Sequence, residues 1–172
     1  MMLKRTIEKA LNQQINAEMY SAYLYLSMST YFESLSLPGF AGWMKVQAQE
    51  EMSHAMKIYD FVHERGGAVK LMPIDGPPVK WASPVAVFEA TLAHERKVTG
   101  LINKLVDLAI KEKDHASNIF LQWFVTEQVE EEASADELLQ QLKRIGNAGH
   151  ALLMMDKEMG RRTFTAPAEE GA

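Results

Sequence analysis

The stretch EEMSH at residues 50–54 has a counterpart in EQVEE at residues 127–131, and each position of the second lies 77 residues after its partner in the first. Glu18 and Glu95 are separated by the same 77 residues. Side chains three residues apart lie on one face of a helix. The repeat therefore predicts two related helix pairs, each of which directs one lone glutamate and one pair of polar side chains at a shared centre.

Apolar residues spaced by threes and fours predict four long amphipathic helices. These run from about Thr6 to Phe32, from Pro38 to just before Gly66, from Pro84 to about Ala109 and from Asp114 to about Leu142. Each apolar stripe is broken by polar residues near its middle: Glu18 in the first, Glu51 and His54 in the second, Glu95 in the third, and Gln128 and Glu131 in the fourth. We expect these side chains to face the core.

The segment 68–83 holds prolines and a glycine without a helical period, so it predicts a 16-residue connection. Sixteen extended residues reach ~53 Å, whereas a helix of ~28 residues is ~42 Å long. The connection is long enough to return the chain along the whole bundle. The second and third helices are therefore expected to be parallel.

The chain after residue 145 predicts a short appendage to the bundle. Residues 146–149 break the fourth helix, an apolar fifth helix is expected at about 150–160, and a tail rich in proline, glutamate and alanine follows at 163–172. So short a helix needs cover, and it either folds back onto the bundle or packs against other copies. The fold class expected is all-α, with one domain over residues 1–172 and the four-helix bundle at about 6–145.

Composition excludes several classes of function. The 18 basic and 23 acidic residues give a net charge of −5 without a basic run, which argues against nucleic acid as a partner. The absence of cysteine excludes disulfides, thiolate metal sites and a cysteine nucleophile. No stretch approaches the ~18 apolar residues of a membrane span, and no signal core begins the chain. We expect a cytoplasmic protein that does not bind membranes.

The inward polar positions predict a metal centre. Buried carboxylates are costly unless they are paired or bind a cation, and the four stripes carry no lysine or arginine. The four glutamates Glu18, Glu51, Glu95 and Glu131 carry a charge that two divalent ions would neutralise. Oxygen ligands with one imidazole favour iron or manganese over a structural zinc, and spacing does not separate iron from manganese.

The chain resembles the non-haem ferritins of bacteria and archaea over nearly its whole length. The motifs that carry the resemblance are NAE at 16–18, QEE at 49–51 with HA at 54–55, and EQVEE at 127–131. The resemblance implies a ferritin-like bundle. It also implies that one iron is held by Glu18, Glu51 and His54 and a second by Glu51, Glu95 and Glu131, with Glu51 bridging.

Further residues receive roles only through this resemblance. Gln128 would hydrogen-bond near the iron pair or ligate weakly, and Tyr25 corresponds to a tyrosine that the family keeps beside the pair as an electron donor. Glu50, Glu127 and Glu130 resemble a third iron site on the cavity side, which shares Glu131.

The function implied is ferroxidase activity and iron storage. Fe(II) and dioxygen would be the substrates, and Fe(III) oxide-hydroxide would be deposited inside a hollow cage. The family builds homo-oligomeric shells of twenty-four subunits, in many of which the short fifth helix gathers at four-fold axes. Self-assembly would then be part of the function.

Three alternatives accompany this interpretation. Met52 directly follows the bridging glutamate, where bacterioferritins carry a haem-ligating methionine, but those proteins have Glu and His where this chain has Gln128 and Glu131. A diiron oxidoreductase acting on peroxide or an organic substrate is a second alternative. A metal-free helical scaffold is the third, and buried unpaired glutamates argue against it.

The remaining histidines lack ligand-spaced partners and are expected at the surface or at interfaces: His63, His94, His115 and His150. His115, with Asp114, would lie at the turn between the third and fourth helices. At that turn the pair is a candidate lining for an iron entry pore.

Overall fold

Five helices form from the segments that the apolar periodicity marks, and the all-α fold class is confirmed. The computed structural model describes residues 2–146 and 148–165, so part of the tail expected at 163–172 lies outside the described residues. The helices are α1 (Arg5–Ser34), α2 (Pro38–Glu64), α3 (Pro84–Lys111), α4 (His115–Ile145) and α5 (Gly149–Met159). None of these described helices is long and apolar enough to cross a membrane.

Local sequence explains where α3 and α4 begin. Ser83 caps α3 by accepting a hydrogen bond from the backbone N–H of Ala86, and Asp114 caps α4 in the same way through Ser117. Pro84 occupies the first turn of α3, where its missing N–H costs nothing.

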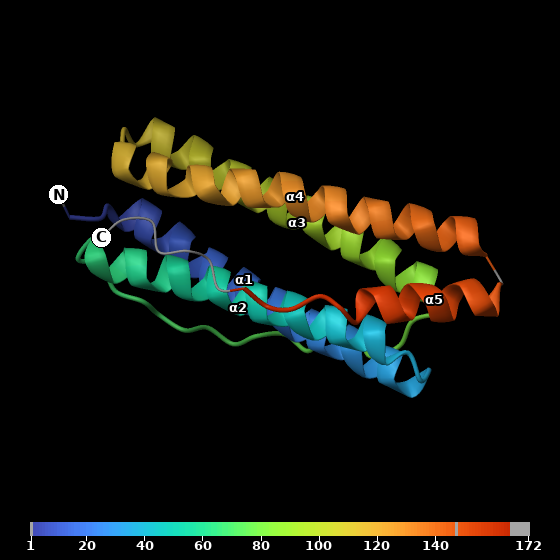
Figure 1. Cartoon of the computed structure of the whole chain (residues 1–172). Coiled ribbons are helices and arrows are strands. Elements are labelled where there is room, and N and C mark those ends of the chain that lie inside the picture. The colour runs from blue at the N-terminus through green and yellow to red at the C-terminus, as the bar shows by residue number, and fades with distance from the viewer. Residues whose placement is uncertain (1, 147, 166–172) are drawn as a thin grey trace.

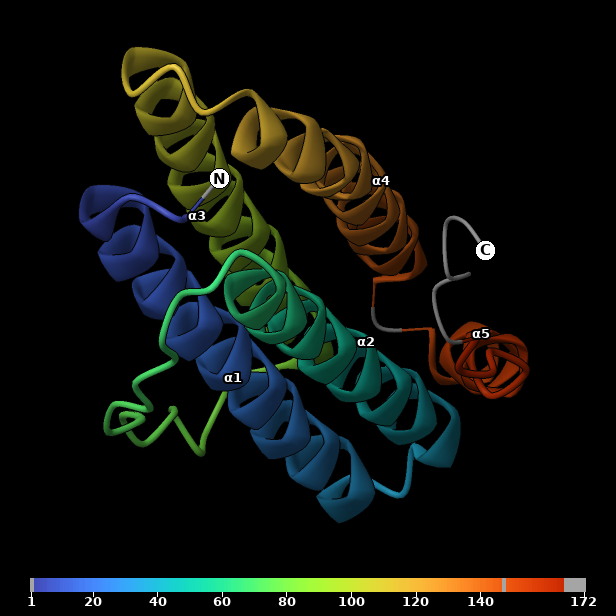
Figure 2. The same cartoon turned by 90° about the vertical axis from the view of Figure 1, so that its left-hand side faces the viewer.

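The helices pack as two antiparallel pairs, α1 with α2 and α3 with α4, and α2 runs parallel to α3 (Figure 1). The connection between α2 and α3 lies along α1, as Figure 2 shows. Asn16 donates to the carbonyl oxygen of Pro73 at 3.0 Å, and Ser27 donates to that of Pro78 at 2.6 Å. The predicted long crossover is therefore confirmed.

Two apolar clusters fill the bundle on either side of its middle. One includes Phe32, Phe40 and Phe88, which pack together at the end where α2 begins. The other includes Leu11 and Ile102, toward the opposite end. The polar positions of the four stripes fall between these clusters, so protein covers the centre from both ends.

The fifth helix packs against α2. Of the two alternatives for covering its apolar face, folding back onto the bundle is therefore seen within the chain. The side chain at the N-cap of α2, Leu37, makes no capping hydrogen bond. Instead the carboxylate of Asp156 in α5 accepts from the backbone N–H of Phe40 at 2.9 Å. A carboxylate at a helix N-terminus is favourable there. Gly39 permits the approach, because a Cβ at this position would lie 1.7 Å from the backbone oxygen of Asp156.

Gly39→Ala is expected to displace α5 from α2. Hydrogen exchange of the α5 backbone amides measures the effect, and the variant should exchange at least ~10-fold faster because the contact cannot form. Gly42→Ala is the matched control, since a Cβ at Gly42 has nothing within 4 Å. Equal protection of α5 in both variants would contradict this description of the contact.

Candidate metal centre

Glu18 of α1 and Glu51 and His54 of α2 form, within the described part of the chain, the one group of three or more His, Cys, Asp or Glu side chains that could hold a metal ion. One ligand atom from each lies within 4.8 Å of the others. Nδ1 of His54 is 3.5 Å from Oε2 of Glu51. Gln14 donates to Oε1 of Glu18 at 2.8 Å, whereas Oε2 of Glu18 is buried without a hydrogen-bond partner. An orphaned buried carboxylate oxygen beside two further ligand atoms fits a metal ion.

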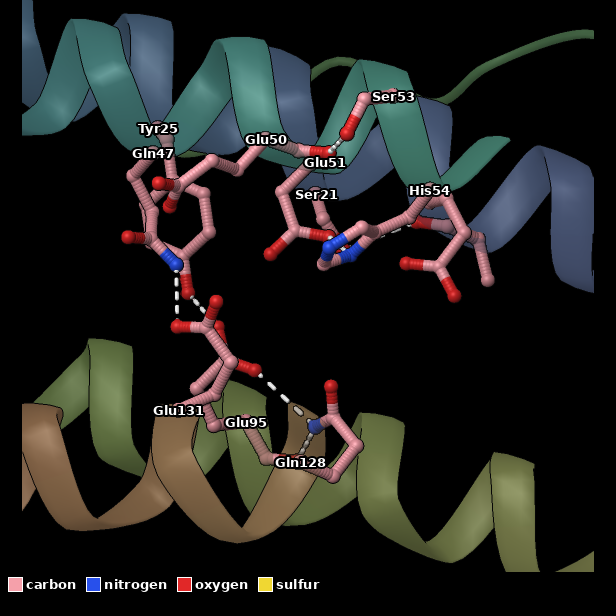
Figure 3. A network of polar contacts seen from close by, with 12 residues as sticks. Ser21, Tyr25, Gln47, Glu50, Glu51, Ser53, His54, Glu95, Gln128 and Glu131 are labelled. Atoms are coloured by element: carbon pink, nitrogen blue, oxygen red, sulfur yellow. Dashed lines mark hydrogen bonds and ion pairs between the residues drawn. The ribbon is translucent and has the colours of Figure 1, made fainter. Parts of the chain in front are cut away.

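Glu95 of α3 and Gln128 and Glu131 of α4 lie opposite this group, across the space between the two helix pairs (Figure 3). Glu95 accepts a hydrogen bond from the hydroxyl of Tyr25 and another from Nε2 of Gln128 at 3.2 Å. Glu131 accepts from Nε2 of Gln47 at 2.6 Å. Each carboxylate of this second half is therefore held by a neutral donor, which leaves its other lone pairs for a cation.

Burial and mutual repulsion disfavour the charged forms of these carboxyl groups. Burial, followed by the charge of Glu51, raises the pKa of Glu18 to about 8. Burial, followed by the charge of Glu131, raises the pKa of Glu95 to about 7. The pKa of Glu51 is raised well above its usual value, first by burial and then by Glu95 and Glu131. A divalent ion would reverse this preference, because it stabilises the ionised ligands.

Aromatic packing fixes the histidine of the site. The His54 ring contacts Trp123 edge-on, with ring centroids 5.3 Å apart, and contacts Phe124 at 6.0 Å. Both aromatic residues come from α4, whereas His54 is on α2. The imidazole is thus oriented by the opposite helix pair and not by its own helix alone.

Three further glutamates, here called the inner carboxylates, are less buried than Glu18 and Glu51: Glu50, Glu127 and Glu130. Glu50 is partly buried and lies within electrostatic range of Glu127 and Glu131. Burial is the first cause that raises the pKa of Glu127, which also feels the charge of Glu130. Glu130 itself is exposed. The structure therefore brings Glu50, Glu127 and Glu131 toward one another and leaves Glu130 at the rim.

Sequence reasoning missed several side chains at this centre, among them Gln47 and Arg162. Gln47 lies one turn before Glu51 on the same stripe and hydrogen-bonds Glu131. Arg162, beyond α5, forms an ion pair with Glu50. The spacing of Gln47 is a usable signal, because it falls on the inward face of α2. Nothing in the local sequence of Arg162 indicates its partner.

His94 differs from the other three histidines that were expected at the surface. It is partly buried, Nε2 lies 2.7 Å from the hydroxyl of Ser21, and its ring packs against Tyr20 and Tyr25. Burial, followed by the charge of Lys97, lowers the pKa of His94 to about 4, so the ring is neutral at physiological pH. The aromatic Tyr25 is therefore flanked by a neutral imidazole as well as by Glu95.

The remaining residues that the sequence analysis singled out lie as follows. His63, His115 and His150 are exposed. Asp114 is buried and engaged by Arg65 at 3.1 Å in addition to its capping role. Only the exposed His115 is left to line an entry route at this turn. Met52 is 43% exposed on α2.

A crossover four-helix bundle with inward carboxylates and a histidine at mid-helix defines the class of helix-bundle proteins with a carboxylate metal centre. The comparisons with known proteins narrow this class. A family model described as the ferritin-like domain of ferritin matches residues 8–145. The chain belongs to the ferritin family.

Individual relatives agree with this assignment. A bacterial non-heme ferritin of Bacteroides fragilis is 48% identical over 94% of this chain and 100% of its own length. One from Staphylococcus aureus is 37% identical over 95% and 98%. A solved structure of an engineered closed form of the Archaeoglobus fulgidus ferritin is 55% identical, with a TM-score of 0.94 over 95% of this chain and 99% of that chain. The open pore ferritin of the same archaeon has a TM-score of 0.93 over 94% and 98%.

Metal binding is expected to release protons and to tighten as the pH rises from ~6 to ~8. In the metal-free protein the pKa of Glu18 is about 8 and that of Glu95 about 7, so both carry a proton at the lower pH that a metal ion must replace. Calorimetric titration with Zn²⁺ in two buffers of different ionisation enthalpy counts these protons. Metal binding without proton release at the lower pH would contradict the raised pKa values.

The same pKa values set the pH dependence of the metal-free fold. The pKa of Glu18 is raised from 4.5 to about 8 on folding. The stability that Glu18 contributes is therefore full below pH 4.5, and it is lost as the pH rises through 8. Glu18→Gln removes this cost, so metal-free Glu18→Gln should melt ~5 °C higher than the parent at alkaline pH and equally at acidic pH. An equal melting temperature at alkaline pH would count against a buried, strained Glu18.

Proposed function

We propose that this chain is the subunit of an iron-storing ferritin that oxidises Fe(II) with dioxygen and deposits Fe(III) oxide-hydroxide inside a cage. The observation that carries the proposal is the buried group of Glu18, Glu51 and His54, with one oxygen of Glu18 lacking any partner. Oxygen-rich ligands with one imidazole suit iron. Membership of the ferritin family supports iron as the substrate.

Two irons are assigned to the centre. Glu18, Glu51 and His54 would hold the first, and Glu51, Glu95 and Glu131 the second. The position of Glu51, within electrostatic range of Glu18, Glu95 and Glu131, supports its bridging role. A third, weaker iron would bind between Glu131 and the inner carboxylates.

Neutral neighbours support this assignment. Gln128 donates to the side chain of Glu95 and also lies 3.2 Å from the Thr99 hydroxyl, so it orients a ligand. Tyr25 donates its hydroxyl to Glu95, and burial followed by the Glu95 charge raises its pKa well above the usual value. A protonated phenol beside a metal ligand suits the role of an electron donor, whose proton would pass to Glu95.

The chemistry balances with iron as the reductant. Two Fe(II) ions lose one electron each, and dioxygen accepts both electrons with two protons to leave as hydrogen peroxide. Water supplies the oxide and hydroxide of the mineral, with net release of protons. The protein binds the two ions close together, so that one dioxygen can draw electrons from both. The apolar clusters on either side exclude water and keep the carboxylates available as ligands.

Storage requires a container, and we propose the homo-oligomeric cage of twenty-four subunits that the family builds. The fifth helix buries Met155 and Met159 against the bundle while leaving Leu153 and Met154 exposed. This exposed apolar edge supports contact with another subunit. A cytoplasmic location and a haem-free centre complete the proposal. The similarity to bacterial non-heme ferritins supports a centre without haem.

Glu51→Gln and His54→Ala are expected to slow the rapid oxidation of Fe(II) by at least ~10-fold, because each removes a ligand from the iron pair. Stopped-flow absorbance after mixing with Fe(II) in air measures the rate, and size-exclusion chromatography checks that the oligomer is retained. The iron that elutes with the oligomer from the same size-exclusion column gives the iron kept per subunit.

His63→Ala is the matched control, since His63 lies nine residues after His54 on α2 and is exposed. It should oxidise iron at the parent rate. Parent-like oxidation by both Glu51→Gln and His54→Ala would refute the ligand assignment. A parent protein that oxidises iron but retains no mineral would favour the alternative of a diiron oxidoreductase.

A further inference from the structure

The segment after α5 returns along α2 (Figure 1). It brings the side chain of Arg162 against Glu50, at the edge of the metal centre. Nη1 of Arg162 donates to Oε1 of Gln47 at 2.8 Å, and Nη2 donates to a carboxylate oxygen of Glu50. The guanidinium carbon lies 4.4 Å from the ring centroid of Trp43. Three contacts with one face of α2 therefore fix this side chain.

The charge of Arg162 meets a concentration of negative charge. Glu50 is within electrostatic range of Glu127 and Glu131 as well as of Arg162. The side chains of Arg162 and Glu50 are only 26% and 23% exposed, so water screens their attraction only in part. The guanidinium thus occupies one side of the carboxylate that a third metal ion would need.

Arg162 also acts through Gln47 on Glu131, a proposed ligand of the iron pair. Its N–H group engages Oε1 of Gln47, and this leaves the amide nitrogen directed at Oε2 of Glu131, 2.6 Å away (Figure 3). An amide has one acceptor end and one donor end. Arg162 therefore determines which end of Gln47 faces the carboxylate that the pair and the inner carboxylates share.

We propose that Arg162 is a positioning residue that acts as a built-in counter-cation of Glu50, which a third divalent ion must displace in order to bind. The displacement keeps that ion weakly held, so that iron leaving the pair moves on toward the mineral and does not stay on the inner carboxylates. This inference rests on the third iron site of the proposed function. It extends the metal centre to a residue beyond α5, outside the four-helix bundle.

Titration of the metal-free assembled protein with Zn²⁺, followed by calorimetry, tests the proposal without any redox chemistry. The parent should bind two ions tightly and a third weakly. Arg162→Gln should bind the third ion about tenfold more tightly, because the competing cation is gone, while the affinity of the ion held by Glu18, Glu51 and His54 changes by less than about twofold. Arg162→Lys should stay near the parent.

Arg161→Gln is the matched control, because Arg161 is adjacent, equally charged and exposed. It should leave all three affinities unchanged. If Arg162→Gln binds the third ion as the parent does, or more weakly, the counter-cation role is overturned. An equal gain in Arg161→Gln would also overturn it, since the effect would then be one of net charge.

Trp43 provides a second readout of the displacement. In a Trp81→Phe background, which leaves the packing of Trp123 on His54 intact, tryptophan fluorescence should change as the third Zn²⁺ ion binds and the guanidinium leaves the Trp43 ring. The same background with Arg162→Gln should show no change at that step. A fluorescence change that persists without Arg162 would contradict displacement.

Glu50→Gln separates failure of this inference from failure of the proposed function. It should abolish the third Zn²⁺ ion and leave the first two. If the parent itself binds no third ion, the third iron site fails and the role of Arg162 fails with it. If Glu50→Gln loses the third ion while Arg162→Gln is unchanged, only the role of Arg162 is overturned.

Discussion

The burial of carboxyl groups at the middle of the bundle, together with their mutual repulsion, is the constraint on which the rest of the structure depends. Glu18, Glu51 and Glu95 are almost fully buried, and their raised pKa values reflect how unfavourable their charges are without a cation. Such groups persist only where something compensates them. Under the proposed function, metal ions would compensate these charges inside the bundle, and Arg162 partly compensates that of Glu50 at the edge.

The architecture keeps this unfavourable centre in place. Apolar clusters on both sides supply the packing energy that the polar centre lacks. The crossover along α1 makes α2 and α3 parallel (Figure 1), and the polar side chains of the two helix pairs lie opposite one another (Figure 3). The fifth helix adds a carboxylate cap to α2 through Asp156, and its C-terminal extension then delivers Arg162.

Sequence patterns predicted the helices, the crossover and the inward positions because these follow from local periodicity and a fixed 77-residue offset. They failed where one contact joins distant residues. Asp156 with Phe40, and Arg162 with Glu50, are more than a hundred residues apart and belong to no repeat. His94 looked like a surface histidine because its partner Ser21 is on another helix. The ligand roles came from family resemblance, since spacing alone places side chains and does not assign ions.

The most direct test of the central claim is anomalous diffraction at the iron edge from crystals soaked anaerobically in Fe(II). The proposed ligand assignment predicts two strong peaks per subunit. One should lie between Glu18, Glu51 and His54, and the other between Glu51, Glu95 and Glu131. A weaker third peak is predicted beside Glu50, with the Arg162 guanidinium moved away from it. Iron bound only at the surface, with the buried carboxylates still unliganded, would contradict the account.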